Sequence, residues 1–383
     1  MRFNPTELSS SELELQTEVR QFLKTELAPG THEPCLGMAA RKDKSFSMKM
    51  AERGWVGMAL PKAWGGSDRT AVDRFIVVEE MLRWGAPVGH HWVADRQTGS
   101  VILKFGTDEQ RKRFLPAICR GELGFSIGMS EPDSGSDLAS VSTRAERATG
   151  GWLINGTKIW TSGAHENDWF VCLLRTSSME DGNKHAGLSQ LLIDLQSEGL
   201  EISPIPFLDG SHHFNEVTFN DVFVPDENVV GDVGMGWHQN TTEMAYERGG
   251  PDRWLSPFST IEQLLREAKG TPLEQSVQSL FGELIARYWG IRNLSLSVAR
   301  LIDSGEAPSI ESSLVKEMGT RFEQEVIEKL VQLIELEYSP DSHSLFERML
   351  SQCIVTFPGN TIRGGTIEIL RSVAAKGLQG LPV

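Results

Sequence analysis

The sequence lacks the motifs that mark the most common nucleotide-binding sites. It contains no Gly-x-Gly-x-x-Gly after an expected strand and no Gly-x-x-x-x-Gly-Lys-Ser/Thr loop. These absences exclude the standard signatures of dinucleotide-binding folds and P-loop proteins. The histidine pairs His90-His91 and His212-His213 are direct neighbours. Neighbours in a strand point to opposite faces and do not chelate one ion, so we expect no metal site.

Cysteine is scarce. The 383-residue chain has four cysteines, which are far apart and form no Cys-x-x-Cys pair: Cys35, Cys119, Cys172 and Cys353. This spacing argues against a disulfide framework, a zinc site or an iron–sulfur site. It predicts buried thiols in a reducing compartment.

Positive charge is also in short supply. The chain has 37 lysines and arginines against 52 aspartates and glutamates, for a net charge of −15. We therefore expect no nucleic-acid partner, although a few local donors can still hold a small anionic ligand. The N-terminal stretch is acidic and amphipathic, and no long apolar run follows it. From this we expect no membrane association and a cytoplasmic protein.

Hydrophobic periodicity changes twice along the chain. Residues 10–27, "SSELELQTEVRQFLKTEL", show helical spacing, and the helical texture returns after about residue 236. Between these regions, short apolar or alternating runs separated by turn residues indicate strands. We predict an α+β fold with helical residues 1–121, a β-domain over 122–235 and a helical domain over 236–383.

Three local signals refine this prediction. In "WLINGTKIW", two apolar arms flank Asn155-Gly156, which predicts a β-hairpin. The stretch "FGTDEQRKRFLPAICRG" predicts a helix with Asp108 as its cap. A last helix is predicted to start near Thr366.

Three stretches have the composition of a ligand site. "GMSEPDSGSD" (128–137) exposes backbone N–H groups and hydroxyls that suit a pyrophosphate or a flavin edge, "KIWTSGA" (158–164) offers a ring platform, and "RGGTIEILR" (363–371) is a glycine-rich helix entry. Each also has an ordinary structural explanation: a surface turn, a core tryptophan and a plain cap. From the residues alone, the ordinary explanation is preferred.

Taken together, in this order and spacing, these stretches resemble the acyl-CoA dehydrogenase family of flavoproteins. "GMSEPDSGSD" is similar to the family's TEPxAGSD segment, "GWLINGTKIWTSGA" to its second signature, and "RGGTIEILRSVAAKGLQGLP" to its closing GGTSEIQRN…LGLP. "FNDVFVPDENVVG", "ERGWVGMALPKAWGG" and "FGTDEQRKRFLPAICRGEL" also match, so the resemblance spans nearly the whole chain.

The resemblance implies an N-terminal helical domain, a central β-barrel or sandwich domain and a C-terminal four-helix bundle, with FAD as cofactor. It also implies that a base removes the α proton of an acyl-CoA thioester while the β hydrogen leaves as hydride to flavin N5, giving the 2-enoyl-CoA. The protein must then stabilise the developing enolate and supply a carboxylate with a raised pKa.

The position of that carboxylate is unusual. Many family members carry it directly before the Gly-Thr of the last motif, where this chain has Gly364. In a minority branch, including the isovaleryl-CoA type, the base precedes an arginine on the first helix of the C-terminal domain. Glu247-Arg248, within "MAYERGGPDRW" (244–254), matches that arrangement. We therefore predict Glu247 as the base, with the Gly364 N–H as a donor to the thioester oxygen; the alternative is a solvated acid paired with Arg248 or Arg253.

The same resemblance implies the other site residues. The residues expected to hold FAD are Met129, Ser130, Ser136, Trp160, Ser162, Thr366 and Glu368. Ser136 and Arg248 are expected to contact the acyl-CoA, and Glu368 is a rival acid.

Two family segments are missing. Homotetrameric members carry an Arg-x-x-Phe-Gly and a Gln-x-x-Gly-Gly segment that hold the adenine end of FAD in a neighbouring subunit. The matching regions here read "AKGTPLEQSVQSLFG" and "VQLIELEYSP". We therefore expect an α2β2 heterotetramer with a related subunit, as in bacterial steroid degradation, or otherwise a homotetramer with unrecognised contacts. An electron-transfer flavoprotein is the expected acceptor.

The acyl group is expected to be bulky, branched, cyclic or steroid-derived. A base on this helix accompanies such groups in the family, and the small residues Ala245, Gly249 and Gly250 would leave room, although glycines also permit a kink. The alternatives are a flavin oxidase or monooxygenase on the same fold, and a non-catalytic subunit of a heteromeric dehydrogenase.

Overall fold

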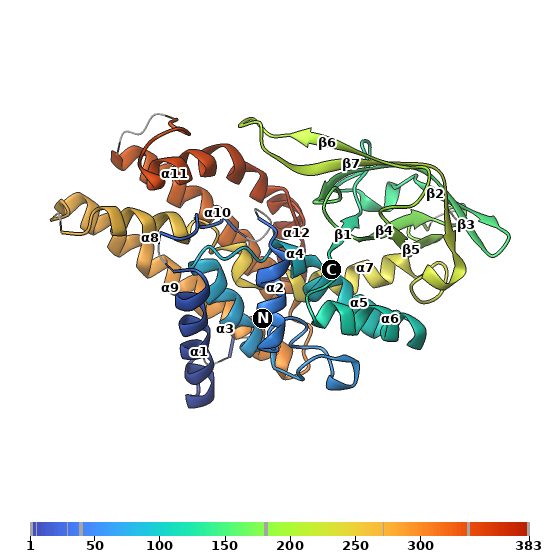
Figure 1. Ribbon diagram of the computed structural model, residues 1–383, viewed down its shortest axis with the longest axis horizontal. Helices are drawn as coiled ribbons and strands as arrows, with labels where there is room; N and C mark the ends of the chain where they lie inside the picture. Colours follow the sequence, from blue (N-terminus) through green and yellow to red (C-terminus); the bar gives the residue numbers. More distant parts are fainter. Residues whose placement is uncertain are drawn as a thin grey trace. The chain divides into compact units, whose positions relative to one another are not determined.

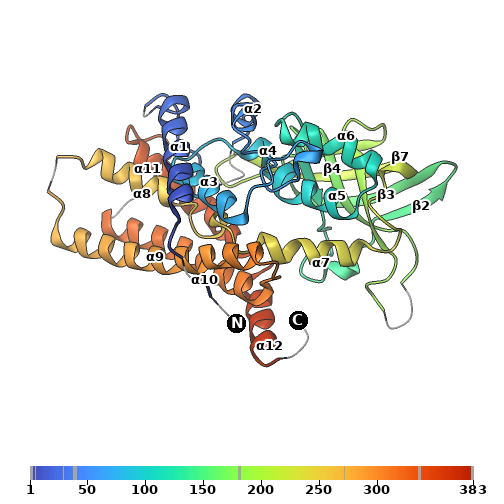
Figure 2. The same ribbon diagram turned by 90° about the horizontal axis from the view of Figure 1, so that it is seen from below.

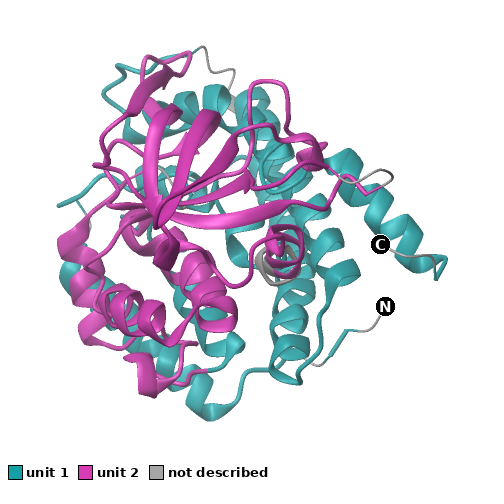
Figure 3. Cartoon of the chain, turned by 90° about the vertical axis from the view of Figure 1, so that its right-hand side faces the viewer, with its two compact units in different colours: residues 1–40, 70–87, 245–383 teal, residues 41–69, 88–244 magenta. Residues whose placement is uncertain are grey.

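The computed structural model describes most of the chain. The described residues are 3–4, 6–28, 30–37, 41–179, 183–270, 272–334 and 338–380, with side chains except those of 243–247 and 334. They form two compact units (Figure 3). Unit 1 comprises residues 1–40, 70–87 and 245–383, and unit 2 comprises residues 41–69 and 88–244. Each unit combines several segments of the chain, so the units do not test the predicted domain boundaries. The division into residues 1–121, 122–235 and 236–383 stays a prediction.

Unit 2 is built on a seven-stranded sheet. Its strands are β1 (Phe125–Gly128), β2 (Arg144–Ala148), β3 (Gly151–Ser162), β4 (Trp169–Arg175), β5 (Leu188–Asp194), β6 (Leu200–Pro206) and β7 (His212–Pro225). The order is β1-β4-β2-β3-β7-β6, and β5 pairs with β4. The long strand β3 pairs antiparallel with both β2 and β7, so it fixes the register of the middle of the sheet.

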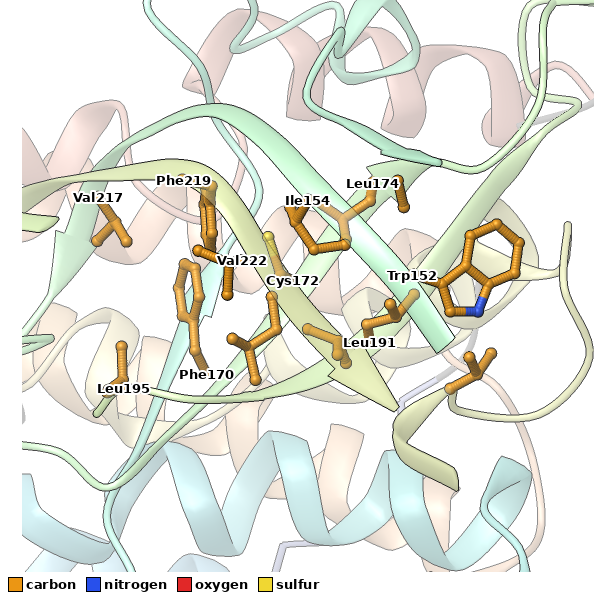
Figure 4. Close-up of a cluster of buried hydrophobic side chains, with 14 of the residues drawn as sticks. Trp152, Ile154, Phe170, Cys172, Leu174, Leu191, Leu195, Val217, Phe219 and Val222 are labelled. Carbon is orange, nitrogen blue, oxygen red and sulfur yellow. The ribbon is translucent and has the colours of Figure 1, made fainter. Parts of the chain in front are cut away.

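Both faces of β4 are covered, which explains its unbroken apolar run. Phe170 and Cys172 point into one cluster together with Phe219 of β7 (Figure 4). The intervening Val171 packs into a second cluster with Phe114 and other residues of short helices. A strand buried on both faces loses the alternation that marks a half-exposed strand.

The helices of unit 2 are short. They are α2 (Lys44–Glu52), α4 (Gly89–Val93), α5 (Gly99–Phe105), α6 (Asp108–Cys119) and most of α7 (Gly236–Glu247). Helices α5 and α6 supply Ile102, Phe114 and Ile118 to the cluster behind β4. The sheet therefore has a helical backing on one side.

Unit 1 is helical. Its helices are α1 (Ser10–Glu26), α3 (Ala71–Arg83), α8 (Phe258–Glu267), α9 (Gln275–Asp303), α10 (Ser309–Ile334), α11 (Leu345–Thr356) and α12 (Ile367–Leu378). The long helices α9 and α10 lie side by side (Figures 1 and 2). A buried ion pair joins α3 to α9, with Arg292 donating to both oxygens of Glu79 at 2.5 and 2.8 Å. This α+β architecture confirms the predicted fold class.

Two local predictions were wrong. Asn155-Gly156 is no hairpin turn, because β3 runs through it with a β-bulge between Ile154 and Gly156. Gly156 has φ +139°, and a Cβ there would lie 2.8 Å from the Thr143 Cα, so glycine is required by a close strand approach. The cap of α6 is Thr107, whose hydroxyl accepts from Gln110 N–H, and not Asp108. A bulge and a hairpin both favour glycine, and the sequence alone did not separate them.

Two other local predictions, the start of the last helix and the buried thiols, are confirmed. Thr366 is the N-cap of α12, and its hydroxyl accepts from the Ile369 N–H. All four cysteines are buried free thiols. None of the described helices is both long and apolar enough to cross a membrane.

Candidate active site

The loop after β1 is anchored by one buried carboxylate. Glu131 accepts from the backbone N–H groups of Ser142 (2.7 Å) and Thr143 (2.9 Å) and from the ammonium of Lys158 (2.8 Å). The Lys158 side chain is fully buried and also donates to the Met129 carbonyl at 3.0 Å. Burial alone would raise the pKa of Glu131, but Lys158 and these donors lower it to about 2. This ion pair was not predicted from the sequence, because it connects residues 27 positions apart.

This anchor holds Met129 and Ser130 against β3. The Ser130 carbonyl accepts from the Ile159 N–H at 3.0 Å, one residue before Trp160. Ser136 lies further along the loop and is exposed. The structure therefore brings Met129, Ser130 and Trp160 together in unit 2.

Trp160 is an exposed aromatic residue in a strained backbone conformation. Its φ is +60°, and it lies in a register shift between Lys158 and Thr161, where β3 bulges away from β7. The side chain is 55% exposed and contacts the edge of Phe214. A left-handed tryptophan is uncommon, and such strain persists only where the surroundings enforce it. The ordinary explanation, a core tryptophan, does not apply.

The residues that follow Trp160 are fixed through their carbonyl groups. The Thr161 carbonyl accepts from Asn215 (3.0 Å), the Ser162 carbonyl from the Ser126 hydroxyl (2.8 Å), and the Gly163 carbonyl from the Lys42 ammonium (2.8 Å). Burial lowers the pKa of Lys42 to about 8. The Ser162 hydroxyl is thus presented by a backbone that is fixed on both sides.

In unit 1, the segment after α7 is packed tightly between two helices. A Cβ on Gly249 would meet Val298 of α9 at 2.5 Å and the hydroxyl of Ser312 of α10 at 3.3 Å. A Cβ on Gly319 of α10 would meet the Arg253 carbonyl at 2.6 Å. The space beside Gly249 is therefore filled by the protein itself, so the sequence argument that this glycine leaves room for a bulky acyl group was wrong.

This packing places two arginines at the glycine turn before α12. Arg248 Nε donates to the Gly364 carbonyl at 3.2 Å. A Cβ on Gly364 would lie 3.2 Å from the Arg253 guanidinium, which forms a buried ion pair with Asp252 at 3.1 Å. Gly364 and Gly365 have φ values of +65° and +91°, which other residues rarely adopt.

Helix α10 contributes two buried ionisable groups that the sequence analysis also missed. The Lys316 ammonium donates to the Gly365 carbonyl at 3.0 Å. Glu323 is fully buried, and it accepts from the Ser256 N–H and the Asn360 side-chain amide at 3.0 Å each. Burial raises the pKa of Glu323. The sequence signal that could have indicated Lys316 and Glu323 is a charged residue among the inward-facing positions of a long helix.

The predicted residues thus fall into two groups. Met129, Ser130, Trp160 and Ser162 are neighbours in unit 2, whereas Arg248, Gly364 and Thr366 are neighbours in unit 1. Glu368 is exposed in the first turn of α12. Helix α7 ends at Glu247, and the predicted role of its side chain lies outside the described residues.

The histidine pairs have structural contacts. His90 and His91 lie in α4, and His91 Nδ1 is 2.8 Å from the Ser47 hydroxyl. His212 stacks on His165 and hydrogen-bonds Asn215 at 2.8 Å. Among the described residues, no group of three or more histidine, cysteine, aspartate or glutamate side chains is arranged to hold a metal ion.

Family models match the chain in three consecutive segments. The acyl-CoA dehydrogenase N-terminal, middle and C-terminal domains match residues 9–122, 126–222 and 234–379, respectively. Among curated proteins, the chain is 34% identical to the acyl-CoA dehydrogenase FadE34 of Mycobacterium tuberculosis over 94% of this chain, but it spans only 49% of that longer relative. It is 31% identical to the acyl-CoA dehydrogenase FadE29 of the same organism, over 97% of this chain and 98% of the relative.

Solved structures of acyl-CoA dehydrogenases (ACADs) also resemble this chain. The Tcur3481-Tcur3483 steroid ACAD superposes with a TM-score of 0.86 at 27% identity, covering 99% of this chain and 100% of that chain. The ChsE4-ChsE5 complex from Mycobacterium tuberculosis superposes with a TM-score of 0.81 at 28% identity, over 99% and 100% of the two chains. The chain therefore belongs to the acyl-CoA dehydrogenase family, whose members are FAD-dependent flavoenzymes.

Proposed function

We propose that this chain catalyses the α,β-dehydrogenation of an acyl-CoA thioester to the 2-enoyl-CoA, with Glu247 as the base. The observation that carries this proposal is the hydrogen bond from Arg248 to the Gly364 carbonyl. It brings the residue directly after Glu247 to the turn where many family members place their base and where this chain has only glycine. A carboxylate at the end of α7 can then serve the position that Gly364 leaves without a side chain.

The glycine turn has a second task in this proposal. The α proton of a thioester is weakly acidic, so its removal needs donors aimed at the carbonyl oxygen where charge develops. Gly364 offers a backbone N–H in a turn whose carbonyls are held by Arg248 and Lys316. Arg248 and the exposed Ser136 are proposed to contact the CoA thioester as well.

The residues of unit 2 fit a flavin ring. Trp160 presents an exposed aromatic surface on a bulge of β3. The Ser130 carbonyl is hydrogen-bonded to Ile159, the residue before Trp160, and Ser162 follows two residues after it. We propose that these residues hold FAD together with Ser136, Thr366 and Glu368. FAD, when bound, supplies the acceptor for the β hydrogen.

The acyl group is proposed to be bulky, in the steroid class. The support comes from relatives, since a solved structure that resembles this chain over its whole length is described as a steroid ACAD. The glycine at 249 offers no support, because Val298 and Ser312 occupy the space beside it.

The partner is proposed to be a related subunit in an α2β2 assembly, with an electron-transfer flavoprotein as acceptor. The two absent adenine-binding segments support this assembly, because a second copy of the chain would lack them too. Two similar solved structures, the Tcur3481-Tcur3483 steroid ACAD and the ChsE4-ChsE5 complex, are each named after two proteins.

Glu247→Gln tests the proposed base. General-base catalysis contributes about 10²–10⁴-fold, so flavin reduction by the acyl-CoA substrate should slow by that factor while the flavin spectrum stays normal. Glu109→Gln, which removes an exposed carboxylate in the first turn of α6, is the control and should keep the wild-type rate. Normal turnover of Glu247→Gln in the assembled complex would favour a non-catalytic subunit, and oxygen consumption matching turnover would favour an oxidase.

A further inference from the structure

Lys316 is a buried lysine, and most of the described charged groups that act on it are cations. Its side chain is fully buried on α10. The charged groups that act on it are Arg253, Arg363 and Arg248, which disfavour its protonation, and Glu323, which favours it. Burial, reinforced by these arginines, lowers the pKa of Lys316 to about 7. Buried lysines ordinarily pair with carboxylates, whereas the hydrogen bond that the described residues give Lys316 goes to a backbone carbonyl.

The hydrogen bond made by Lys316 lies at the glycine turn. Its ammonium donates to the Gly365 carbonyl at 3.0 Å, and Arg248 donates to the preceding carbonyl, that of Gly364, at 3.2 Å. Two consecutive peptide units are thus held by cations. Both residues are glycines with left-handed φ angles. They have no side chains of their own that could fix these two peptide units.

We propose that Lys316 is a positioning residue for acyl-CoA oxidation, which holds the Gly365 carbonyl and thereby aims the N–H of Gly364 at the thioester oxygen. This inference rests on the proposed function, in which that N–H stabilises the enolate. The ammonium of Lys316 has a second effect, because a cation beside the turn favours the negative charge that develops on the thioester. Lys316 itself need not touch the substrate for either effect.

The charges around the turn define when Lys316 acts. Three cations act on Lys316 of α10: Arg248 and Arg253 from the segment after α7, and Arg363 from the turn. Three described acids have partners of their own: Asp252 pairs with Arg253, Glu317 of α10 pairs with Arg371 of α12, and Glu323 accepts from Ser256 and Asn360 while it also favours the Lys316 ammonium. Glu368 lies exposed in the first turn of α12. Since the pKa of Lys316 lies below that of an ordinary lysine, its ammonium is present below about pH 7 and is lost as the pH rises through that value.

The test measures enolate stabilisation without turnover. Acetoacetyl-CoA is an acidic β-ketoacyl thioester whose enolate absorbs in the ultraviolet, so its enolisation constant can be titrated on the FAD-loaded protein, with the partner subunit present if FAD requires it. Lys316→Met removes both the donor and the charge, and should lower this constant about tenfold, less than the 10²–10³-fold loss for a donor that touches the oxyanion directly. Lys316→Gln keeps a donor without the charge and should fall between wild type and Lys316→Met.

The pH profile separates positioning from a merely structural role. In the wild type, the enolisation constant, corrected for the probe's own ionisation, should weaken as the pH rises through neutrality, whereas in Lys316→Met and Lys316→Gln it should not. Lys329→Met, on the same helix at a more exposed ion pair with Glu283, is the control and should behave like the wild type. Thermal unfolding and FAD content of each variant show whether the fold is intact.

Two results would overturn the inference. One is an enolisation constant for Lys316→Met equal to that of the wild type at every pH. The other is a loss in Lys316→Met that matches the loss of bound FAD and shows no change in pH dependence. Failure of the proposed function can be told apart from failure of this inference. Normal turnover of Glu247→Gln would refute the assignment of Glu247 as the base, whereas the enolisation constants of the Lys316 variants would still be measurable.

Discussion

Trp160 combines two features that a side chain with a purely structural role rarely has: exposure and a left-handed backbone. The 55% exposed ring contributes little to the core, and the φ of +60° costs about 1–2 kcal/mol for a residue other than glycine. Strain of this kind concentrates at ligand sites, where it presents a group in a fixed direction. At the scale of a single residue, this geometry is the strongest physical argument for a ring-binding platform.

Trp160→Ala should therefore reduce cofactor retention without unfolding the protein. Because the side chain is exposed, we expect the free energy of unfolding to change by less than about 1 kcal/mol. The control is Trp152→Ala on the same strand, where the ring is only 4% exposed and its removal should cost about 3–5 kcal/mol. Denaturant titration and the ratio of flavin to protein absorbance measure the two effects. Full FAD retention in Trp160→Ala would contradict the platform role.

The low pKa of Glu131 predicts how the free energy of unfolding changes in acid. Its pKa is about 2 in the folded protein against an ordinary value of 4.5, so the folded state binds this proton less tightly than the unfolded state does. The stabilisation from this carboxylate is complete above about pH 4.5 and is lost as the pH falls toward about 2. At 1.36 kcal/mol for each pH unit, it amounts to about 3 kcal/mol.

The measurement is the free energy of unfolding as a function of pH for the wild type and for Glu131→Gln. The variant should be less stable by about 3–5 kcal/mol at neutral pH, because Lys158 is left as a buried charge without its partner. Its stability should also fall less steeply in acid. Glu146→Gln removes an exposed carboxylate paired with Arg144 and should stay within about 0.5 kcal/mol of the wild type. An acid limb that is identical in the wild type and Glu131→Gln would refute this assignment.

At the scale of secondary-structure elements, two helix glycines should respond oppositely to the same substitution. Gly319 of α10 lets the Arg253 carbonyl approach to 2.6 Å from the position a Cβ would occupy, so Gly319→Ala should push the 248–254 segment away from α10 and cost about 1–3 kcal/mol. A Cβ added to Gly282 of α9 would have no described atom within 4 Å outside its own helical turn, so Gly282→Ala should stabilise the helix by up to about 1 kcal/mol. Thermal unfolding of both variants checks the pair.

Activity adds a second check on Gly319→Ala. Because the 248–254 segment carries Arg248 to the glycine turn, the variant should also slow turnover, whereas Gly282→Ala should not. If Gly319→Ala were as stable and as active as the wild type, the tight packing of this segment against α10 would be irrelevant to the site.

The elements also show what sequence patterns can and cannot predict. The α12 cap at Thr366 follows from contacts within four residues, and the pattern predicted it correctly. Asn155-Gly156 was assigned wrongly, because the reason for the glycine is the approach of Thr143, which directly precedes β2. The Glu131–Lys158 and Lys316–Gly365 contacts join residues that are 27 and 49 positions apart, and no local pattern encodes them.

At the scale of the whole molecule, the proposed cofactor site depends on a group that this chain does not supply. The chain has the residues proposed to contact the flavin ring and those of the glycine turn, but it lacks the arginine segment that holds the adenine end of FAD in family members. One charge-assisted hydrogen bond to a phosphate is worth about 1.5–3 kcal/mol, so its absence weakens FAD binding roughly 10- to 100-fold. With a net charge of −15, the chain has no general surplus of positive charge to compensate.

We therefore expect the chain purified alone to be colourless or weakly yellow, and the same chain co-expressed with a related subunit that carries the arginine segment to bind FAD stoichiometrically. Visible absorbance and the mass of the assembly measure both properties, and adding excess FAD to the isolated chain should restore only part of the colour. Replacing the partner's arginine by alanine should return the complex to the colourless state, which assigns the effect to that contact and not to assembly in general. If the isolated chain holds one FAD per subunit through repeated gel filtration, the heteromeric assembly loses its physical basis. In that case, a homotetramer with adenine contacts of a different kind becomes the better account of this molecule.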